Sequence, residues 1–133
     1  MPLVLLDTDV FSFVFKQDTR AALYRPALEG ASLCLSFQTV AELRLWALVR
    51  RWGEARRQSL ESTFKRYTVL PYDDAMSRAW ADLTAHRRRL GRPIETGDAW
   101  IAASALRHDA TLLTHNAKDY ADIPNLRILS HGS

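Results

Sequence analysis

Short apolar runs alternate with longer amphipathic stretches along the chain. The runs at 3–6, 33–35 and 67–70 have the length and composition of buried strands, and 111–116 is expected to be a strand that ends in a polar loop. Helical spacing follows the second run to about residue 66, with a break near Gly53, and it returns from Asp74 to Leu90, where Gly91 ends it. A further helix is expected around 98–105, with closing strands after it, and one helix is expected between the first two strands. This alternation predicts an α/β fold with a mainly parallel central sheet and helices on both faces.

The length and composition are those of one globular unit. The chain has 133 residues, of which 47% are apolar, so we expect residues 1–133 to form a single domain. The longest apolar runs are far too short to cross a membrane, and the first residues do not resemble a secretion signal, so we expect a cytoplasmic protein. The one cysteine, Cys34, lies in a strand and is expected to be a small core residue.

Four acidic residues lie at positions that an α/β fold brings together. Asp7 follows the first strand, and Asp119 lies just beyond the strand that begins at Thr111. Glu42 and Asp98 lie near helix starts, on faces that are otherwise apolar; that of Glu42 includes Leu45, Trp46 and Val49. Ligand sites in open α/β sheets form outside the carboxyl ends of the strands. We therefore expect the four carboxylates to share one cleft.

A cluster of buried carboxylates needs a cation, because desolvation and mutual repulsion both oppose ionisation. The hard oxygen ligands, with no cysteine pair and no closely spaced histidines, favour Mg²⁺, with Mn²⁺ as a substitute. Each acid also has a structural alternative. These are a turn or helix cap for Asp7, an ion pair with Arg44 or Arg50 for Glu42, a first-turn dipole acid for Asp98 and a solvated loop charge for Asp119.

The net charge of +3 is concentrated in two arginine-rich segments. One holds the candidate RNA-binding residues Arg50, Arg51, Arg56 and Arg57, and the other holds Arg87, Arg88, Arg89 and Arg92. The planar guanidinium group suits phosphate, and a basic rim offsets the repulsion between substrate phosphates and an acidic cleft. Arginine-rich helix faces are also commonly solvated or ion-paired, and the sequence leaves both interpretations open.

The aromatic and histidine residues give weaker indications. Trp46, Trp80 and Trp100 lie in apolar helical segments and are expected in the core or at an interface, whereas Trp52 near the helical break is the better candidate for contact with a partner. The histidines lack metal-binding spacing, and His115 is expected in an exposed loop.

The order of these motifs resembles the PIN-domain ribonucleases, and among them the VapC-type toxins of bacterial toxin-antitoxin pairs. Residues 5–12 are similar to the opening motif of that family, 40–43 to its second acid and 98–105 to its third. The segment from Leu112 through Asp119 to Pro124 is similar to its closing motif. One position departs from the pattern, since Asp9 stands where these toxins usually carry asparagine. The resemblance implies a PIN-like three-layer fold.

The residues predict metal-assisted hydrolysis of a phosphodiester, in which Asp7, Glu42, Asp98 and Asp119 hold Mg²⁺ and Thr114, Asn116 and Asp9 support them. The resemblance adds the substrate, a structured RNA such as tRNA or rRNA. It also implies a homodimer and a VapB-type antitoxin that covers the cleft.

Two other functions remain open on the sequence. The Asp7–Asp9 spacing also fits a haloacid-dehalogenase-like phosphatase, although that chemistry requires a lysine for which Lys65 is a poor candidate. The second is a non-catalytic module that binds RNA or a partner on a PIN scaffold.

Overall fold

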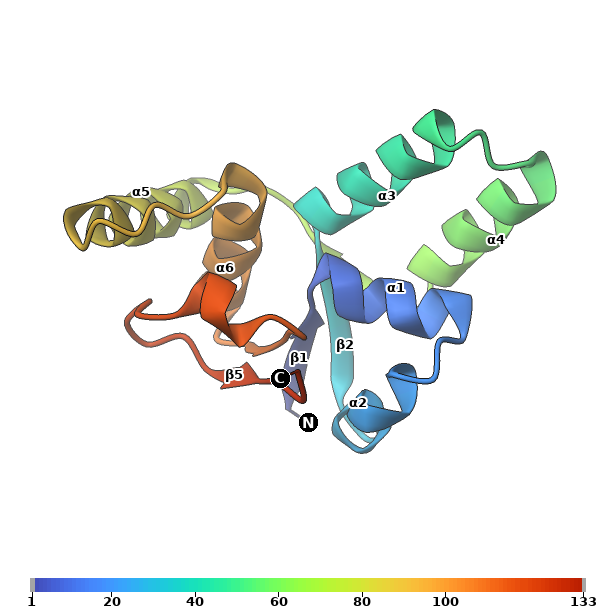
Figure 1. Ribbon diagram of the computed structural model, residues 1–133, viewed down its shortest axis with the longest axis horizontal. Helices are drawn as coiled ribbons and strands as arrows, with labels where there is room; N and C mark the ends of the chain where they lie inside the picture. Colours follow the sequence, from blue (N-terminus) through green and yellow to red (C-terminus); the bar gives the residue numbers. More distant parts are fainter. Residues whose placement is uncertain (1, 133) are drawn as a thin grey trace.

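The computed structural model describes residues 2–132 and is built around a parallel five-stranded sheet (Figure 1). The strand order is β3-β2-β1-β4-β5, so the first strand is central. The strands are β1 Leu3–Leu6, β2 Ser32–Ser36, β3 Thr68–Leu70, β4 Thr111–Leu113 and β5 Ile128–Leu129. The α-helices are α1 Thr8–Lys16, α2 Ala21–Leu28, α3 Phe37–Val49, α4 Glu54–Phe64, α5 Asp74–Arg89 and α6 Thr96–His108, and a 3-10 helix, η1, spans Ala117–Tyr120.

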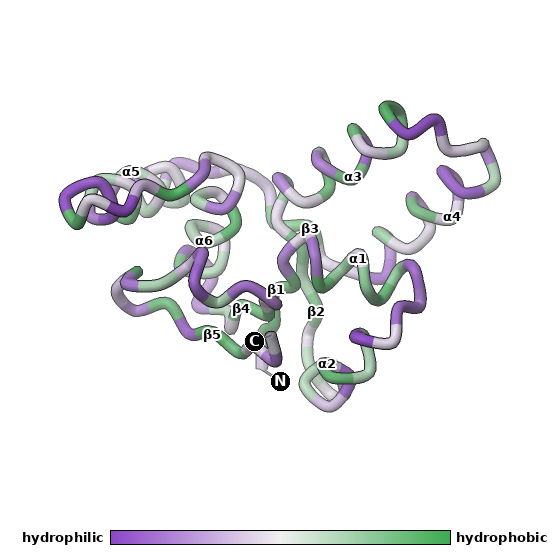
Figure 2. Tube along the Cα trace, in the orientation of Figure 1, coloured by the Kyte–Doolittle hydropathy of each residue, from purple (hydrophilic) through white to green (hydrophobic). Residues whose placement is uncertain are grey.

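The sheet separates two hydrophobic cores, which confirms the three-layer α/β prediction. Successive side chains of a strand point to opposite faces, and β1 shows the consequence. Val4 and Leu6 pack with residues of α1 to α4, whereas Leu5 packs with α5 and α6. The three central strands, β2, β1 and β4, have few polar residues because both of their faces are largely covered, whereas Thr68 and Val69 of the edge strand β3 are exposed. In Figure 2 the central strands accordingly lie toward the hydrophobic end of the scale.

The segment between β1 and β2 contains two helices rather than the single helix expected. The second, α2, is only eight residues long and contains Pro26, which cannot donate a backbone hydrogen bond. Its position depends on tertiary contacts, chiefly the fully buried Tyr24, whose hydroxyl donates to the carbonyl of Thr114 at 3.1 Å. Helices this short depend on packing rather than on local propensity, and the sequence pattern offered little sign of this one.

Helices α3 and α4 form the antiparallel hairpin expected from the break near Gly53, and Figure 1 shows it projecting from the sheet. Buried Leu60 and Phe64 attach α4 to the core. The expected apolar stripe on α3 is not buried as a whole, because Leu45 is 57% and Val49 is 70% exposed. The hairpin is attached at its base, so its outer residues reach beyond the sheet.

Arg87 is a structural residue, which corrects its assignment to an exposed basic cluster. Its side chain is buried and donates hydrogen bonds to three backbone carbonyls, those of Arg92, Asp119 and Ala121, at 2.7, 3.0 and 3.1 Å. The guanidinium group therefore fastens η1 to the end of α5. Among the described helices, none has the length and hydropathy needed to cross a membrane.

Candidate active site

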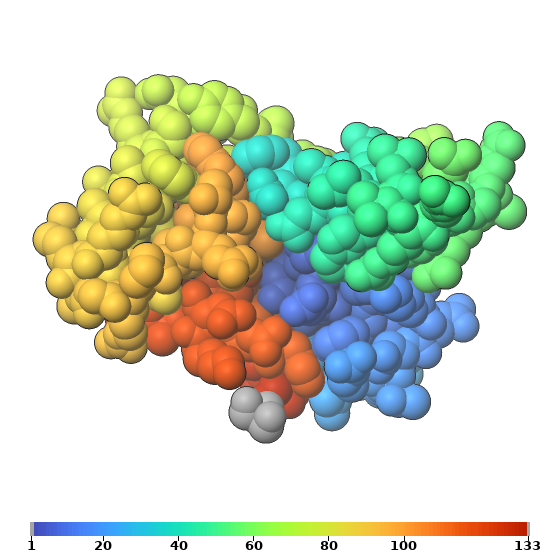
Figure 3. All heavy atoms as spheres, turned by 45° about the horizontal axis from the view of Figure 1, so that its top comes forward, coloured from blue at the N-terminus to red at the C-terminus, as the bar shows by residue number. Residues whose placement is uncertain are grey.

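A small acidic cleft opens at the carboxyl end of β1, where the sequence placed the candidate site. It is lined by Asp7, Thr8, Asp9, Glu42, Trp46, Asp98, Ile101 and Tyr120. In Figure 3, the blue residues of the amino-terminal segment come to the surface between α3 in cyan, α6 in orange and the red-orange closing segment. The cleft has a volume of about 80 Å³. Segments from four parts of the sequence therefore meet at this point.

Asp7 is the most deeply placed acid of the cleft. Its backbone N–H donates to the carbonyl of Leu113 at 2.9 Å, and its Oδ1 accepts a hydrogen bond from the N–H of Val10 at 2.8 Å. The side chain is thus the N-cap of α1, as one structural alternative proposed. Burial is the main cause that raises its pKa from 3.8 to about 7, while the hydrogen bond from the Thr114 side chain opposes the rise. Although Asp7 caps a helix, its buried carboxylate is therefore costly to ionise.

Asp98 lies in the first turn of α6, beside Tyr120. The Tyr120 hydroxyl donates to Asp98 Oδ1 at 3.3 Å, and burial raises the pKa of that hydroxyl, so it stays protonated. Burial and then the charge of Asp119 raise the pKa of Asp98 to about 6. A Cβ at Gly97 would lie 2.8 Å from Glu42 Oε1, the end of a flexible side chain. The start of α6 therefore lies beside Glu42.

The other two acids differ in their placement. Glu42 lines the cleft, and neither Arg44 nor Arg50 pairs with it, because Arg44 binds Glu61 and Arg50 lies over the Trp46 ring. Its Oε1 accepts a hydrogen bond from Gln38 Nε2 at 2.8 Å. Asp119 is exposed on η1 and is not part of the lining, although its charge is near enough to act on Asp98. The structure therefore brings three of the four predicted acids into one cleft and leaves Asp119 at its edge.

Three further predicted residues form a hydrogen-bonded chain that leads to Asp7. The Nδ2 of Asn116 donates to Asp9 Oδ2 at 3.1 Å, and the N–H of Asn116 donates to Thr114 Oγ1 at 3.1 Å. Thr114 is fully buried, and its hydroxyl hydrogen-bonds to Asp7. The charge of Asp9 in turn raises the pKa of Asp7. The loop after β4 thus fixes the orientation of two acids of the cleft.

The donor set of the cleft fits a hard divalent cation. Its carboxylate oxygens are the ligands that Mg²⁺ prefers, and a cation would offset the raised pKa values of Asp7 and Asp98. Within residues 2–132, however, no three side chains of His, Cys, Asp or Glu already lie close enough together to enclose an ion. Mutual repulsion of the carboxylates and the hydrogen bond from Gln38 to Glu42 both favour this open arrangement. Ion binding therefore requires these side chains to turn toward each other.

The Thr114 hydroxyl gives a direct test of the supporting chain. Thr114→Val keeps the shape but removes the hydrogen bonds to Asp7 and Asn116. Because groups that orient metal ligands typically contribute about 10- to 100-fold to metal affinity or activity, the variant should need about 10-fold more Mg²⁺ for half-maximal activity. Thr114→Ser keeps the hydroxyl and is the control. An unchanged Mg²⁺ requirement in Thr114→Val, with both variants folded in a thermal melt, would remove Thr114 from the site.

Two cleft residues, Trp46 and Tyr120, were not assigned to the site from the sequence. From the sequence, Trp46 is expected in the core or at an interface, and Tyr120 has no expected role. Trp46 lies one helical turn after Glu42 and faces the same side, so the i, i+4 spacing was the available signal. Tyr120 carried no comparable signal, because its orientation depends on η1 and on Arg87.

His115 is packed rather than exposed in a loop, which corrects the prediction. Its Nδ1 shares a hydrogen bond with the Tyr24 hydroxyl at 2.7 Å, and its ring lies edge-on to Phe13 with 5.2 Å between centroids. The Tyr24 hydroxyl also accepts from the N–H of His131 at 3.1 Å. His115 therefore joins α1 and α2 to the end of β4, next to the buried Thr114.

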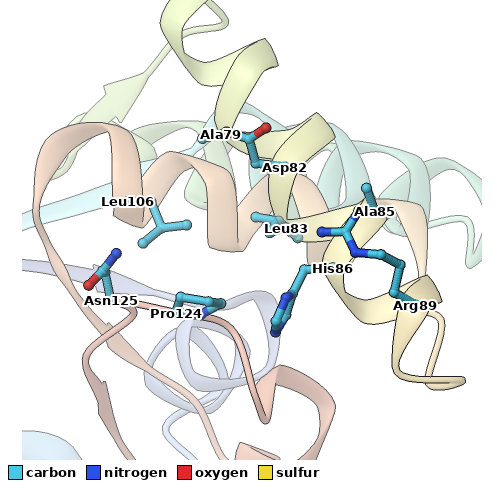
Figure 4. Close-up of a pocket in the computed structure, with 9 residues that line it drawn as sticks. All are labelled: Ala79, Asp82, Leu83, Ala85, His86, Arg89, Leu106, Pro124 and Asn125. Atoms are coloured by element: carbon cyan, nitrogen blue, oxygen red, sulfur yellow. The ribbon is translucent and has the colours of Figure 1, made fainter.

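A larger hollow of about 540 Å³ lies on the α5 side of the molecule (Figure 4). It is lined by Ala79, Asp82, Leu83, Ala85, His86, Arg89, Leu106, Pro124 and Asn125. Asp82 is the one acid in its lining, and none of the predicted site residues reaches it. The small acidic cleft is therefore the better candidate for the reaction.

Comparisons with known proteins agree on one family. The profile of the PIN domain matches residues 4–126. Ribonuclease VapC4 of Mycobacterium tuberculosis is 33% identical over 95% of both chains, and the tRNA(fMet)-specific endonuclease VapC of Shigella flexneri is 28% identical over 92% of this chain and 93% of its own. The structure of VapBC-1 from nontypeable Haemophilus influenzae superposes with a TM-score of 0.84, at 28% identity over 96% of this chain and 97% of the other.

Proposed function

Because the chain belongs to the PIN domain family, we propose that it is a metal-dependent endoribonuclease and the toxin of a type II toxin-antitoxin pair. The observation that carries the proposal is the convergence of Asp7, Glu42 and Asp98 in one small cleft, where burial raises the pKa of Asp7 and of Asp98. Relatives that match over nearly their whole length are ribonucleases by name. The residues of the cleft and the names of the relatives thus both favour metal-dependent cleavage of RNA.

In this proposal Asp7, Asp98 and Glu42 hold Mg²⁺, with Mn²⁺ as a substitute, and Asp119 contributes from the edge of the cleft. A divalent ion bound there supplies acidification of water and neutralisation of the charge that develops on the phosphate. Asp7 keeps its orientation through the Val10 N–H and the Thr114 hydroxyl. The Tyr120 hydroxyl orients Asp98 by donating a hydrogen bond to it. No covalent intermediate with the protein is required.

The partners follow from the relatives. The matched structure from Haemophilus influenzae is a VapBC complex, and the Shigella flexneri relative is named for cleavage of tRNA(fMet). We therefore infer a VapB-type antitoxin as the partner of this chain and a structured RNA, tRNA or rRNA, as its substrate. A homodimer and a cytoplasmic location complete the proposal.

The basic residues of the hairpin provide a test of phosphate binding. Arg50, Arg51, Arg56 and Arg57 are all exposed around the turn between α3 and α4. If Arg51 and Arg57 each neutralise a phosphate of single-stranded RNA, replacing both by alanine should reduce the slope of log affinity against log salt by about 0.7 per phosphate. The control is Arg78→Ala on α5, where the arginine already pairs with Asp74 at 3.1 Å. Equal slopes for the double variant and the parent would make the hairpin arginines ordinary solvated residues.

The phosphatase alternative requires a lysine beside Asp7. Lys65 follows the end of α4 and lines a separate groove with Glu54 and Ser62, outside the acidic cleft. The direct test is to incubate the purified protein with labelled RNA and, separately, with a small phosphate monoester, in Mg²⁺ and in EDTA. Cleavage of RNA in Mg²⁺ alone supports the proposal. RNA cleavage that persists undiminished in EDTA, or hydrolysis of the monoester alone, contradicts it.

A further inference from the structure

The wall of the acidic cleft contains two large aromatic side chains. Tyr120 is buried and donates its hydroxyl to Asp98, whereas Trp46 is only half-buried. We propose that Trp46 stacks against an unpaired base of the RNA next to the bond that is cut, and so selects single-stranded substrate. The inference rests on the proposed ribonuclease function but assigns a role to a residue that this function does not require.

The position of Trp46 follows from the geometry of α3. It lies four residues after Glu42, so both side chains emerge on the same side of the helix and line the same cleft. The side chain is half-buried, and its inner part packs against the core formed by α1 to α4. The remainder of the indole lies at the cleft beside the acids.

The size of the cleft decides where RNA can lie. A volume of about 80 Å³ accommodates an ion and a few water molecules, since one water needs about 10–15 Å³ by a comparable measure. A nucleoside does not fit beside the acids. The RNA chain must therefore cross the mouth of the cleft, where the neighbouring base meets the side chains of the wall.

The other tryptophans already have aromatic partners within the protein. Trp80 stacks on Trp100 at 5.2 Å between ring centroids, and Trp52 stacks on Phe15 at 5.9 Å. In the part of the chain that the structure describes, Trp46 has no aromatic partner. A half-buried indole without a ring partner therefore lies at the edge of the cleft, where a base would stack on the part of the ring that Arg50 does not cover.

Arg50 places a positive charge beside the Trp46 ring. Arg50 directly follows the last residue of α3, and its guanidinium carbon lies 4.9 Å from the centre of the Trp46 ring. A cation over the indole holds the ring in place and provides a positive group for the phosphate that follows the stacked base. Base stacking is tolerant of sequence, because every base has a π face. The pair therefore favours unpaired RNA over duplex RNA without choosing a particular base.

The test compares Trp46→Leu, which keeps apolar packing but removes the ring, with Trp46→Phe, which keeps a ring. The binding probe is a short single-stranded RNA of mixed sequence, in EDTA to prevent cleavage, alongside a ribose-phosphate chain of the same length without bases. Trp46→Leu should weaken RNA binding about 10-fold, leave binding of the base-free chain unchanged, and be partly rescued in Trp46→Phe.

Tyr72→Leu is the matched control, because Tyr72 is an exposed aromatic residue that already has a ring partner, Trp100 at 6.1 Å between centroids, and lies outside the cleft lining. It should bind RNA as the parent does. Equal RNA affinity for Trp46→Leu and the parent, or an equal loss of affinity for the base-free chain, overturns the inference.

A cleavage assay in Mg²⁺ separates this result from the proposed function. The parent should cut single-stranded RNA, and Trp46→Leu should raise KM more than it lowers kcat. If the parent cuts and Trp46→Leu has the same KM, stacking at Trp46 is wrong while the ribonuclease function stands. If the parent does not cut RNA at all, the proposed function fails and the inference fails with it.

Discussion

Asp7→Asn and Asp98→Asn are each expected to reduce Mg²⁺-dependent RNA cleavage by more than about 100-fold. Groups that merely orient a metal ligand contribute about 10- to 100-fold to metal affinity or activity. Removing the charge of a ligand itself should therefore reduce activity by a larger factor. The fold should survive, because asparagine at position 7 can still accept the Val10 N–H that caps α1, and Asp98 is only partly buried. Initial rates on labelled RNA, with circular dichroism as the check on folding, measure the effect.

Asp18→Asn is the matched control for this experiment. Asp18 lies at the start of α2, where it binds the backbone and side chain of Arg20, away from the cleft lining. Its replacement should leave the rate near that of the parent. Substantial activity in a folded Asp7→Asn protein would show that the charge of Asp7 is needed only for the helix cap.

The second large effect is on stability without metal. The pKa of Asp7 is about 7 in the folded protein and 3.8 in the unfolded chain, so ionising it costs the folded state roughly 4 kcal/mol at about 1.4 kcal/mol per pKa unit. Asp7→Asn removes this cost and keeps the cap, while it loses about 0.3–1 kcal/mol of charge–dipole stabilisation. The variant should therefore unfold at a higher temperature than the parent in EDTA at about pH 8.

The dependence on pH has a definite sign. Between the two pKa values the folded state binds more protons than the unfolded chain, so the free energy of unfolding contributed by Asp7 falls as pH rises from about 4 to about 7. The difference in free energy of unfolding between the variant and the parent should therefore grow across this pH range and be small below it. Asp98, with a pKa of about 6, makes the free energy of unfolding fall with rising pH in both proteins in the same way.

Added Mg²⁺ should narrow the difference in melting temperature by stabilising the parent more than the variant. If only the folded state binds, the gain is about 2.7 kcal/mol at 100 times the dissociation constant. Thermal melts of both proteins, in EDTA and in Mg²⁺ at several pH values, give the melting temperature of each protein with and without the ion. A variant that melts below the parent in EDTA, with equal gains from Mg²⁺, would make Asp7 a structural cap alone.

The sequence predicted the parts of the fold that depend on local pattern. The strand at 3–6 and the helix ending at Gly91 are marked by apolar periodicity and by glycine, and both lie where expected. The place of Asp7 in the site followed from one general property, that the carboxyl ends of parallel strands share an edge of the sheet. Asp98 was indicated by its position near a helix start on an otherwise apolar face. These inferences needed no knowledge of distant contacts.

What the sequence missed depends on contacts between distant residues. Arg87 looked like one of several exposed arginines, yet its three carbonyl acceptors lie up to 34 residues away. These contacts fix η1, and with it they turn Tyr120 into the cleft and leave Asp119 exposed at the edge. His115 was misplaced for the same reason, since its partner Tyr24 lies 91 residues away in a helix that the pattern hardly indicated.

The most direct measurement of the central claim, that these acids hold the ion on which cleavage depends, is a Mn²⁺ titration followed by the electron paramagnetic resonance signal of free Mn²⁺. Parent protein and the Asp7→Asn, Asp98→Asn double variant are titrated at about pH 8, and RNA cleavage is measured at each point. The parent should bind Mn²⁺ and so remove it from solution, and its rate of RNA cleavage should rise in step with the bound ion. The double variant should neither bind Mn²⁺ nor cleave RNA. Equal Mn²⁺ binding by both proteins, or cleavage by the parent that does not follow the bound ion, would contradict the account.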